Sequence, residues 1–504
     1  MNIRIIFYII GWIMECEAGL FMLPCVTALY YHERQGLAFL LVAVIEAVLG
    51  FFLVRKKPKQ TTFYAKEGFI TVALCWIILS IFGAAPFVIT KEIPNVFNAL
   101  FETVSGFTTT GASILLKVED LSRTSLMWRS FTHWIGGMGV LVFILAILPI
   151  SGGSSVYLLR AESPGPVVGK LTPKIRQTAL ILYAIYFAMT VTLIILLKIG
   201  GMSGFDSVTL SFGTAGTGGF GVRGTSIQSY SHFCKIVIAI FMMLFGINFN
   251  IYYFILMGRI KEALKSEELH WYLAIMAVST IFITMNILYR YHNVGMALTD
   301  AYFQVSSVMT TTGYATTDFN LWPQQSKTIL VMIMFIGGCA GSTGGGIKVS
   351  RIVMLLKTIP KEIGYYIHPH SVRKLHFEGR AIEHETVRSV SVYLAIYVMI
   401  FAFSMLVLSF DKVDMVSSFT AVTATFNNIG PGLELVGPWG NYAFFSPISK
   451  LVLIFDMLAG RLELMPLLLL LSPSIWKETI DNHKKKRRKR KELEEQEHIK
   501  HWRG

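Results

Sequence analysis

Hydrophobic residues along the chain are grouped in ten long runs that few charged residues interrupt. A helix that crosses a lipid bilayer needs about 20 predominantly apolar residues, and the runs are of this order of length. The pattern therefore predicts an all-α integral membrane protein with ten crossings. The runs cover residues 3–31, 36–54, 68–90, 124–150, 174–199, 231–257, 270–290, 326–357, 386–410 and 447–472.

Four shorter apolar segments lie between the third and fourth, fifth and sixth, seventh and eighth, and ninth and tenth runs. Each ends in residues rich in Gly, Thr or Asn, so their length and composition argue against fourteen full crossings. Irregular backbone is tolerated at membrane depth only where protein buries it or where it lines a water-filled cavity. We therefore expect four re-entrant segments, at residues 97–113, 205–221, 299–315 and 416–432.

The re-entrant segments align with one another on one glycine each. The aligned glycines are Gly111, Gly219, Gly313 and Gly430, and 108, 94 and 117 residues separate them. Thirteen positions before each glycine stands a residue of the type that caps helix N-termini: Asn98, Asp206, Asp300 and Ser417. Each segment is thus predicted to form a helix of two to three turns, capped at that residue, and then an extended glycine strand.

The alignment divides the chain into a prefix and four repeats, as expected of a period that recurs four times. Each repeat holds a span, a short helix, a glycine strand and a second span. We expect the four repeats to surround a central pore with pseudo-fourfold symmetry. The predicted units are a two-helix segment at 1–60, repeats at 61–166, 167–266, 267–380 and 381–476, and a basic tail at 477–504.

Composition agrees with a membrane protein: 53% of the 504 residues are hydrophobic and 15% are charged, against about 25% charged in soluble domains. The net charge of +14 falls to +6 without the basic block at 484–491. Such a block fits a cytoplasmic tail against anionic lipid, and we expect no nucleic-acid binding. The five cysteines form no CxxC pair, which excludes a disulfide or zinc framework.

Lysine and arginine are concentrated in the links between the repeats, near positions 55–59, 160–176, 259–265 and 357–388. Cytoplasmic loops are enriched in these residues, so we expect the links to be cytoplasmic. An even number of spans then places both termini in the cytoplasm, and the re-entrant segments enter from the opposite face. The first run lacks a convincing cleavage site, so no removable signal peptide is expected.

Four converging glycine strands suit the passage of a dehydrated cation. Backbone carbonyls replace the water around K⁺ in known pores, and glycine reaches the backbone conformations that turn carbonyls inward. The C-terminal ends of short helices add partial negative charge, and the hydroxyls of Thr110 and Thr312 could add acceptors. One such loop alone is typical of a simple turn, whereas four in register favour a pore.

The motifs TTTGAS (108–113), HWIGGMGV (133–140), TTTGYATTDF (310–319), GGCAGSTGGGIK (337–348), NNIGPG (427–432) and GRLE (460–463) resemble those of the K⁺ transporter superfamily that includes TrkH, KtrB and the plant HKT proteins. The two-helix prefix favours the bacterial TrkH branch. The resemblance implies a filter for K⁺, the transported ion, rather than Na⁺, because position 111 is glycine. Its residues are Thr110, Gly111, Gly218, Gly219, Thr312, Gly313, Asn428, Ile429 and Gly430.

The resemblance also implies partners. We expect a homodimer in the bacterial inner membrane that binds a cytosolic Trk-type regulatory subunit. A nucleotide, ATP, ADP or NAD, is expected only on that subunit, because this chain lacks an ATP-hydrolysing motif. No covalently bound cofactor is expected.

The eighth run is interrupted by six glycines in ten residues, between 337 and 346. Each glycine costs a helix about 1 kcal/mol relative to alanine, so we expect a loop inside the membrane at 337–348, here named the glycine loop. It lacks the Gly-Lys-[Ser/Thr] ending of a phosphate-binding loop. The resemblance implies a gate beneath the filter, formed by Gly337, Gly338, Gly341, Gly344, Gly345, Gly346 and Lys348, together with Arg461.

Three polar residues in apolar surroundings leave alternatives open. Arg461 either pairs with Asp456 or Glu463, or, as the resemblance implies, repels cations below the filter; a charge at that depth is usually paired or faces a cavity. His133 fits hydrogen bonding in a packed site better than a proton relay. Glu102, in the first short helix, either supports the filter or contributes to the ion entrance.

The sequence favours a K⁺ uptake transporter with a channel-like pore. The alternative within transport is a Na⁺ or poorly selective monovalent cation transporter. A membrane-embedded enzyme is a different class, but the chain holds no catalytic Asp pair, GxSxG or HExxH. We therefore expect no enzymatic activity.

Overall fold

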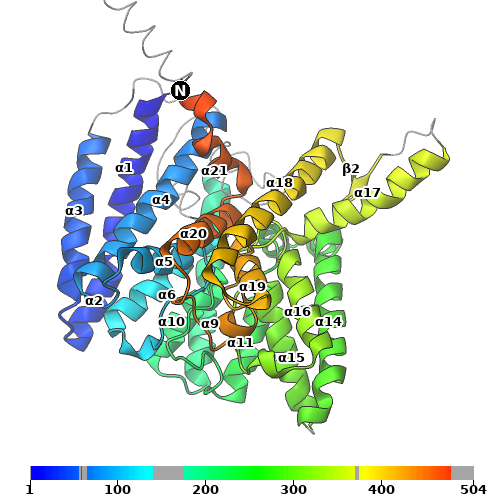
Figure 1. The fold of residues 1–504 in the computed structure, drawn as a ribbon, viewed down its shortest axis with the longest axis horizontal. Helices are drawn as coiled ribbons and strands as arrows, with labels where there is room; N and C mark the ends of the chain where they lie inside the picture. Colours follow the sequence, from blue (N-terminus) through cyan, green and yellow to red (C-terminus); the bar gives the residue numbers. More distant parts are fainter. Residues whose placement is uncertain are drawn as a thin grey trace, which may run out of the picture.

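The computed structural model describes residues 2–55, 58, 65–139, 175–291, 293–368 and 374–477. The basic block at 484–491 and parts of the basic links lie outside these residues. The described chain is almost entirely helical, and its helices form one bundle from which α17 projects (Figure 1). The predicted all-α membrane fold is confirmed.

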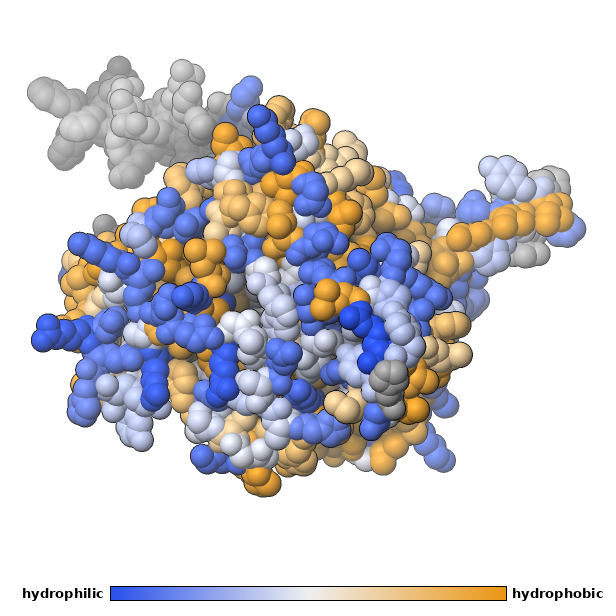
Figure 2. Space-filling view, turned by 60° about the horizontal axis from the view of Figure 1, so that its bottom comes forward, coloured by the Kyte–Doolittle hydropathy of each residue, from blue (hydrophilic) through white to orange (hydrophobic). Residues whose placement is uncertain are grey.

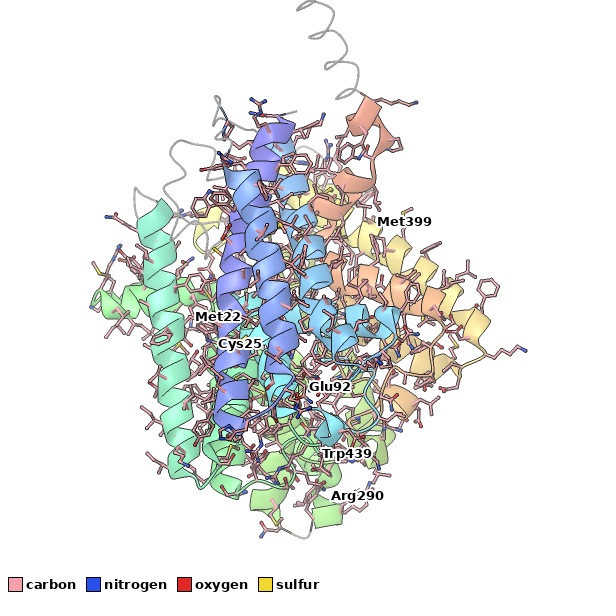
Figure 3. All side chains as sticks on the ribbon, turned by 90° about the vertical axis from the view of Figure 1, so that its left-hand side faces the viewer. Met22, Cys25, Glu92, Arg290, Met399 and Trp439 are labelled. Atoms are coloured by element: carbon pink, nitrogen blue, oxygen red, sulfur yellow. The ribbon has the colours of Figure 1, made fainter. Side chains whose placement is uncertain are left out.

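The prefix consists of α1 (Ile3–Leu20), α2 (Met22–Tyr31) and α3 (Gly36–Val54). Helices α1 and α3 stand side by side on one flank of the bundle (Figure 3). Glycines permit this close packing, because a Cβ on Gly50 would lie 2.9 Å from the carbonyl oxygen of Gly11. Small residues at such crossings are typical of membrane helices.

In the described part of the chain, each repeat contains a long helix, a shorter helix and one to three further helices. The first has α4 (Ala65–Ile89), α5 (Val96–Phe107) and α6 (Arg123–Met138). The second has α9 (Ile175–Ile199), α10 (Gly204–Gly216), α11 (His232–Phe245), α12 (Phe249–Leu256) and α13 (Ile260–Ala263). The third has α14 (Glu267–Tyr291), α15 (Val294–Met309), α16 (Gln324–Ile336) and α17 (Val349–Ile367), and the fourth has α18 (His384–Leu408), α19 (Met415–Phe426), α20 (Pro447–Arg461) and α21 (Leu464–Leu471).

A two-stranded antiparallel hairpin of β1 (His376–Phe377) and β2 (Arg380–Ala381) joins the third and fourth repeats. Single 3₁₀ turns follow the re-entrant segments of three repeats and the long helix of the fourth. They are η1 (Val118–Asp120), η2 (Phe319–Leu321), η3 (Ser409–Asp411) and η4 (Glu434–Val436).

Six of the ten predicted crossings are long apolar spans in the described part of the chain: Ile3–Tyr31, Gly36–Val54, Ala65–Ile89, Gln177–Ile199, Glu267–Tyr291 and His384–Asp411. The other four are the second spans of the repeats, and their helices are shorter. The break in the eighth run was predicted.

The breaks in the sixth and tenth runs were not predicted. Helices α11 and α12 meet at 91°, where Gly246 ends the first helix and Asn248 caps the second. The tenth run breaks at Glu463, which has a φ of 62°. Helix α6 ends at Met138, and residues 140–150 of the fourth run lie outside the described part.

The four short helices α5, α10, α15 and α19, here called the pore helices, begin earlier than predicted. They have 12, 13, 16 and 12 residues, which is more than three turns. Their N-caps are Asn95, Ser203, Asn293 and Asp414, each of which accepts hydrogen bonds from N–H groups of the first turn. Only a residue placed before the first free N–H can do this.

The predicted caps therefore lie inside the pore helices, where their side chains bind other segments. All four stand at the predicted positions relative to the aligned glycines, but each hydrogen-bonds to a residue outside its own helix. Asn98 accepts a hydrogen bond from Lys450 (2.8 Å), Asp206 from Tyr230 (3.0 Å), Asp300 from Thr316 (2.7 Å) and Ser417 from the Leu435 N–H (3.1 Å).

Candidate ion pore

All four pore helices end in the same hydrogen-bond pattern, the Schellman motif. One residue just after the last turn of each helix has a left-handed backbone conformation, with φ between 55° and 60°. These residues are Thr109, Thr217, Thr311 and Asn428. The next N–H group then donates to the carbonyl five residues earlier. These bonds are Thr110 to Ser105 (2.9 Å), Gly218 to Gly213 (2.8 Å), Thr312 to Ser307 (2.8 Å) and Ile429 to Ala424 (2.7 Å).

After these ends the chain continues into four glycine strands, at residues 110–114, 218–221, 312–315 and 429–433. The aligned glycines Gly111, Gly219, Gly313 and Gly430 have φ values of 77°, 77°, 86° and 94°. Residues other than glycine rarely adopt this conformation. Because the glycine strands start at the helix C-termini, the partial negative charge of all four helices is directed at them.

The four aligned glycines form a closed ring in chain order. A Cβ on any of them would overlap or crowd a carbonyl oxygen of the next strand, so only glycine fits. The crowding carbonyl belongs to Gly218 for Gly111, to Thr312 for Gly219, to Ile429 for Gly313, and to Thr110 for Gly430 at 2.6 Å. The structure thus brings all the predicted filter residues to one centre.

The threonine hydroxyls at the ring have partners within the protein. Thr110 shares a hydrogen bond with Thr108, and Thr312 with Thr310, both at 2.8 Å. The amide of Asn428 donates to the Thr110 hydroxyl at 2.9 Å. Main-chain carbonyls are therefore the principal oxygens that the ring offers to an ion.

A cavity of about 100 Å³ lies on the outer side of the ring. Its lining includes the four aligned glycines, Trp439 and Tyr442. Trp439, Glu92 and Arg290 lie toward the same end of the molecule (Figure 3). That face is largely hydrophilic, with apolar residues gathered toward its edges (Figure 2), as expected where loops meet water.

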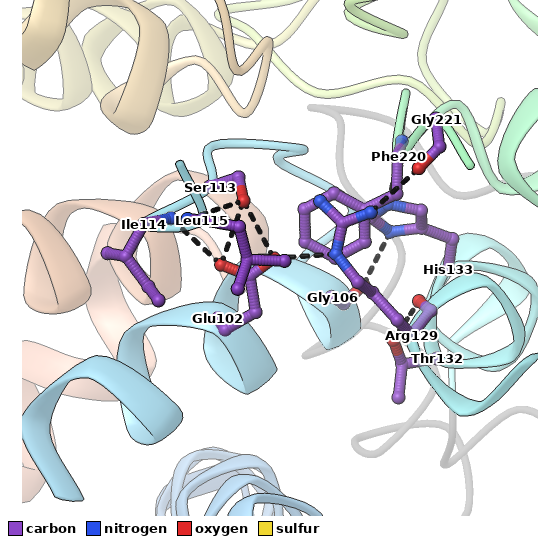
Figure 4. Close-up of polar contacts among 10 residues, drawn as sticks. All are labelled: Glu102, Gly106, Ser113, Ile114, Leu115, Arg129, Thr132, His133, Phe220 and Gly221. Atoms are coloured by element: carbon purple, nitrogen blue, oxygen red, sulfur yellow. Dashed lines mark hydrogen bonds and ion pairs between the residues drawn. The ribbon is translucent and has the colours of Figure 1, made fainter. Parts of the chain in front are cut away.

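Glu102 supports the first glycine strand and does not belong to the lining of this cavity. The residue is 1% exposed. Its carboxylate accepts hydrogen bonds from the Ser113 hydroxyl (3.0 Å) and the Ile114 N–H (2.9 Å) (Figure 4). It also forms a buried ion pair with Arg129, at 2.6 Å. The sequence left two roles open for Glu102, and these contacts favour support of the strand.

His133 is a hydrogen-bonding residue between the first two repeats. Its Nδ1 lies 2.8 Å from the carbonyl oxygen of Gly106, and its Nε2 accepts from the Phe220 N–H at 3.3 Å (Figure 4). One ring nitrogen must donate and the other must accept, which is the pattern of a neutral imidazole. Both nitrogens are thereby occupied, so the geometry favours this role over a proton relay.

The glycine loop lies against the inner ends of the pore helices. The Gly345 N–H donates to the Thr311 hydroxyl at 2.6 Å. A Cβ on Gly345 would be 2.6 Å from the Asn427 carbonyl, and one on Gly344 would be 3.0 Å from the Thr310 carbonyl. Residues 344 and 345 therefore lie directly below the ring.

The rest of the glycine loop is fixed to the second repeat. Cys339 donates to the Gly246 carbonyl, and Phe249 donates to the Gly341 carbonyl, both at 3.0 Å. A Cβ on Gly338 would also lie 3.2 Å from the Gly246 oxygen. Gly337, Gly341 and Gly346 have φ values of 73° to 77°, so the loop depends on glycine at its turns.

Charged residues of the interior hold both ends of the glycine loop. Lys348, 1% exposed, donates to the Gly344 carbonyl. Glu268 of α14 accepts from the N–H groups of Ala340 (2.7 Å) and Ser350 (3.0 Å). Glu268 was not among the predicted functional residues, because it stands just outside the seventh apolar run.

Arg461 connects the glycine loop to the first repeat. Its guanidinium donates to the carbonyls of Thr343 (2.7 Å) and Gly137 (2.6 Å), and also to that of Gly136. The carboxylates considered as ion-pair partners have other contacts: Asp456 accepts from Ser404, and Glu463 pairs with Arg351. A buried positive charge thus joins three repeats below the ring.

Arg129 was also not among the predicted functional residues. It lies within the predicted span 124–150, where a charge in an apolar run is a sign of function.

Comparisons with known proteins agree with this architecture. The model of a family described as "TrkH: Cation transport protein" matches residues 35–478. The "Trk system potassium uptake protein TrkH" of Escherichia coli K12 is 36% identical over 486 residues, which cover 95% of this chain and 100% of the relative. The protein of that name from Vibrio parahaemolyticus is 34% identical over 490 residues, with coverage of 95% and 100%.

A solved structure is also similar. The crystal structure of the potassium transporter TrkH from Vibrio parahaemolyticus matches with a TM-score of 0.85 and 32% identity, over 94% of this chain and 100% of the other. From the extent of the family match and the identity to full-length relatives, the chain belongs to the TrkH family of cation transport proteins.

Proposed function

We propose that the protein takes up K⁺ through a pore formed by the four glycine strands. The ring of aligned glycines, each packed against a carbonyl of the next strand, is the observation that supports this most strongly. The Escherichia coli relative whose name states potassium uptake matches 95% of this chain.

In this proposal the carbonyls of residues 110, 218, 312 and 429 and of the aligned glycines replace the water around K⁺. Several carbonyl dipoles acting together compensate for the free energy of removing water from the ion. The pore helices contribute their C-terminal partial charges, which favour cations over anions. Asn428 and the threonine hydroxyls act indirectly, by holding the strands.

The glycine loop and Arg461 are proposed to form the gate. Residues 344 and 345 lie below the ring, and Arg461 places a positive charge beside them. A cation leaving the ring meets both a physical obstacle and a repulsive charge. Opening must therefore move the loop and break hydrogen bonds of Arg461.

We also propose how the protein assembles and is regulated, from the resemblance of its motifs to the Trk system. The protein forms a homodimer in the bacterial inner membrane, with both termini cytoplasmic. A cytosolic regulatory subunit that binds ATP, ADP or NAD controls the gate, and the basic tail contacts anionic lipid. No nucleotide site is proposed on this chain.

Two measurements test the function. Expression in a bacterium that lacks K⁺ uptake systems should restore growth at low K⁺. Growth is compared between cells with and without the regulatory subunit. Purified protein in liposomes should take up Rb⁺, with K⁺ competing more strongly than Na⁺. Equal competition by Na⁺ would mean that the function is poorly selective cation transport and not K⁺ uptake. Absence of flux from folded protein would overturn the proposal.

A further inference from the structure

Three of the four glycine strands are held by a side chain of their own pore helix. In each case a polar residue of the helix hydrogen-bonds to the strand that follows it, so helix and strand form one unit. The pairs are Glu102 with Ser113 and Ile114, Ser307 with the Tyr314 carbonyl, and Thr420 with the Leu433 N–H.

The second glycine strand lacks this support. Among the described residues 204–221, no side chain of α10 hydrogen-bonds to the strand; the position that Glu102 occupies in α5 is filled by Leu210. The strand also begins with two glycines, Gly218 and Gly219. Glycine is the residue with the greatest backbone freedom, so the second strand is the least constrained by its own repeat.

Helix α6 of the first repeat holds the second strand instead (Figure 4). Arg129 donates to the Gly221 carbonyl at 2.9 Å, and its guanidinium lies 3.5 Å from the centre of the Phe220 ring. His133 accepts from the Phe220 N–H. Helix α6 thus holds the strand at two consecutive residues, through the Phe220 N–H and the Gly221 carbonyl. From the other side, the Tyr314 hydroxyl of the third repeat donates to the Phe220 carbonyl at 3.3 Å.

Both holding residues are themselves anchored in the first repeat. Arg129 is paired with Glu102, which holds the first strand, and His133 is bonded to the Gly106 carbonyl of α5. Arg129 and His133 are 3% and 0% exposed. A displacement of either strand would therefore be transmitted to the other.

We infer that Arg129 and His133 are positioning residues that set cation selectivity by fixing the second glycine strand at the spacing of the first. This inference rests on the proposed function of the ring. Discrimination against a smaller ion requires carbonyls that do not close in around it, whether through cavity size or through the field of the dipoles. A strand that begins with two glycines and keeps only the Tyr314 hydrogen bond to Phe220 would be freer to close in around the ion.

The test uses variants that avoid an unpaired buried charge, because removal of one partner of a buried ion pair is strongly destabilising. Glu102→Gln/Arg129→Gln replaces the ion pair with two amides, and His133→Phe keeps a ring without hydrogen bonds. The matched control is Thr190→Val, which removes the hydrogen bond from Trp134 of α6 at 3.2 Å but does not touch the strand. Gly111→Ser serves as a direct filter variant.

The readout is Rb⁺ uptake by purified protein in liposomes, competed by K⁺ or Na⁺, after size-exclusion chromatography shows each variant to be folded. We expect both test variants to keep Rb⁺ flux and to lose about tenfold of the K⁺ over Na⁺ preference, the scale of one hydrogen bond to a charged group. Thr190→Val should keep the wild-type ratio.

Two other outcomes are distinguishable. Unchanged selectivity in both test variants, with Gly111→Ser altered, would overturn this inference and leave the proposed filter in place. Unchanged selectivity in Gly111→Ser as well would overturn the filter assignment itself, and with it the inference.

Discussion

The guanidinium of Arg461 donates to the carbonyl of Thr343 at 2.7 Å, so a buried cation of the fourth repeat is joined to the glycine loop of the third. The same group reaches Gly137 of the first repeat. One side chain therefore links three repeats directly below the ring of glycines. In the proposed gate, the hydrogen bonds of Arg461 are part of what opening must break.

Arg461→Gln should raise the flux that occurs without the regulatory subunit. The substitution removes the positive charge from the proposed ion path and leaves fewer hydrogen-bond donors for the glycine loop. Rb⁺ uptake into liposomes measures this, and K⁺ over Na⁺ preference should not change. Lys450→Gln is the matched control, since Lys450 is a buried cation on the same helix, 5% exposed, away from the loop. Unchanged basal flux in well-expressed Arg461→Gln would argue against a barrier role.

Gly345→Ala should alter gating and spare selectivity. The new Cβ would lie 2.6 Å from the Asn427 carbonyl and 3.0 Å from the Asn428 Cβ, so the loop must move away from the ring. We expect higher basal flux and a weaker response to the regulatory subunit. Gly204→Ala is the control, because nothing lies within 4 Å of its Cβ. Loss of K⁺ preference in Gly345→Ala would instead assign the loop to the filter.

Gly219→Ala should abolish selective flux. Its Cβ would overlap the Thr312 carbonyl, and a φ of 77° adds strain of order 1 to 3 kcal/mol. Gly201→Ala separates the two effects, because Gly201 has a φ of 89° and nothing within 4 Å. It should lower the thermal midpoint of unfolding but keep the K⁺ over Na⁺ ratio. Normal selectivity in Gly219→Ala would show that this strand does not contact the ion.

Asp414, the N-cap of the fourth pore helix, should make stability sensitive to acid. The Ser417 N–H donates to its carboxylate at 2.8 Å, and this bond lowers the pKa of Asp414 below its usual value. A lowered pKa gives stability that is complete above the unfolded value, about 3.9, and is lost as the pH falls further.

The midpoint of thermal unfolding, followed from pH 7 to about pH 3, checks this. Asp414→Asn should keep the cap at neutral pH and reduce the acid-dependent loss of stability. Asp414→Ala should lower the midpoint at every pH, because a cap is lost. Identical pH dependence of the wild type and Asp414→Asn would show that this carboxylate does not contribute.

The sequence predicted the repeat, its register and the convergence of Gly111, Gly219, Gly313 and Gly430, because a glycine strand is recognisable from residue type and spacing alone. It placed the helix caps three residues too late in α5, α10 and α19 and seven residues too late in α15. Asn98 and Asn95 have equal capping propensity, and only three-dimensional contacts distinguish them. The break at Glu463 was not predicted, because a leucine-rich run contains no residue type that indicates a positive φ.

The support of the second strand was not predictable either. Arg129 and Gly221 are 92 positions apart in the chain and in different repeats, and their contact depends on how α6 packs against α10. The same holds for Glu268, which reaches the glycine loop from another helix of the third repeat. Contacts of this kind follow from packing between elements, which periodicity within one element does not determine.

The anomalous scattering of Rb⁺ in crystals of the protein tests the central claim most directly. The account predicts a peak on the axis of the ring, coordinated by carbonyl oxygens of residues 110–111, 218–219, 312–313 and 429–430. A protein that transports Rb⁺ but shows its bound ion elsewhere, with none inside the ring, would contradict it.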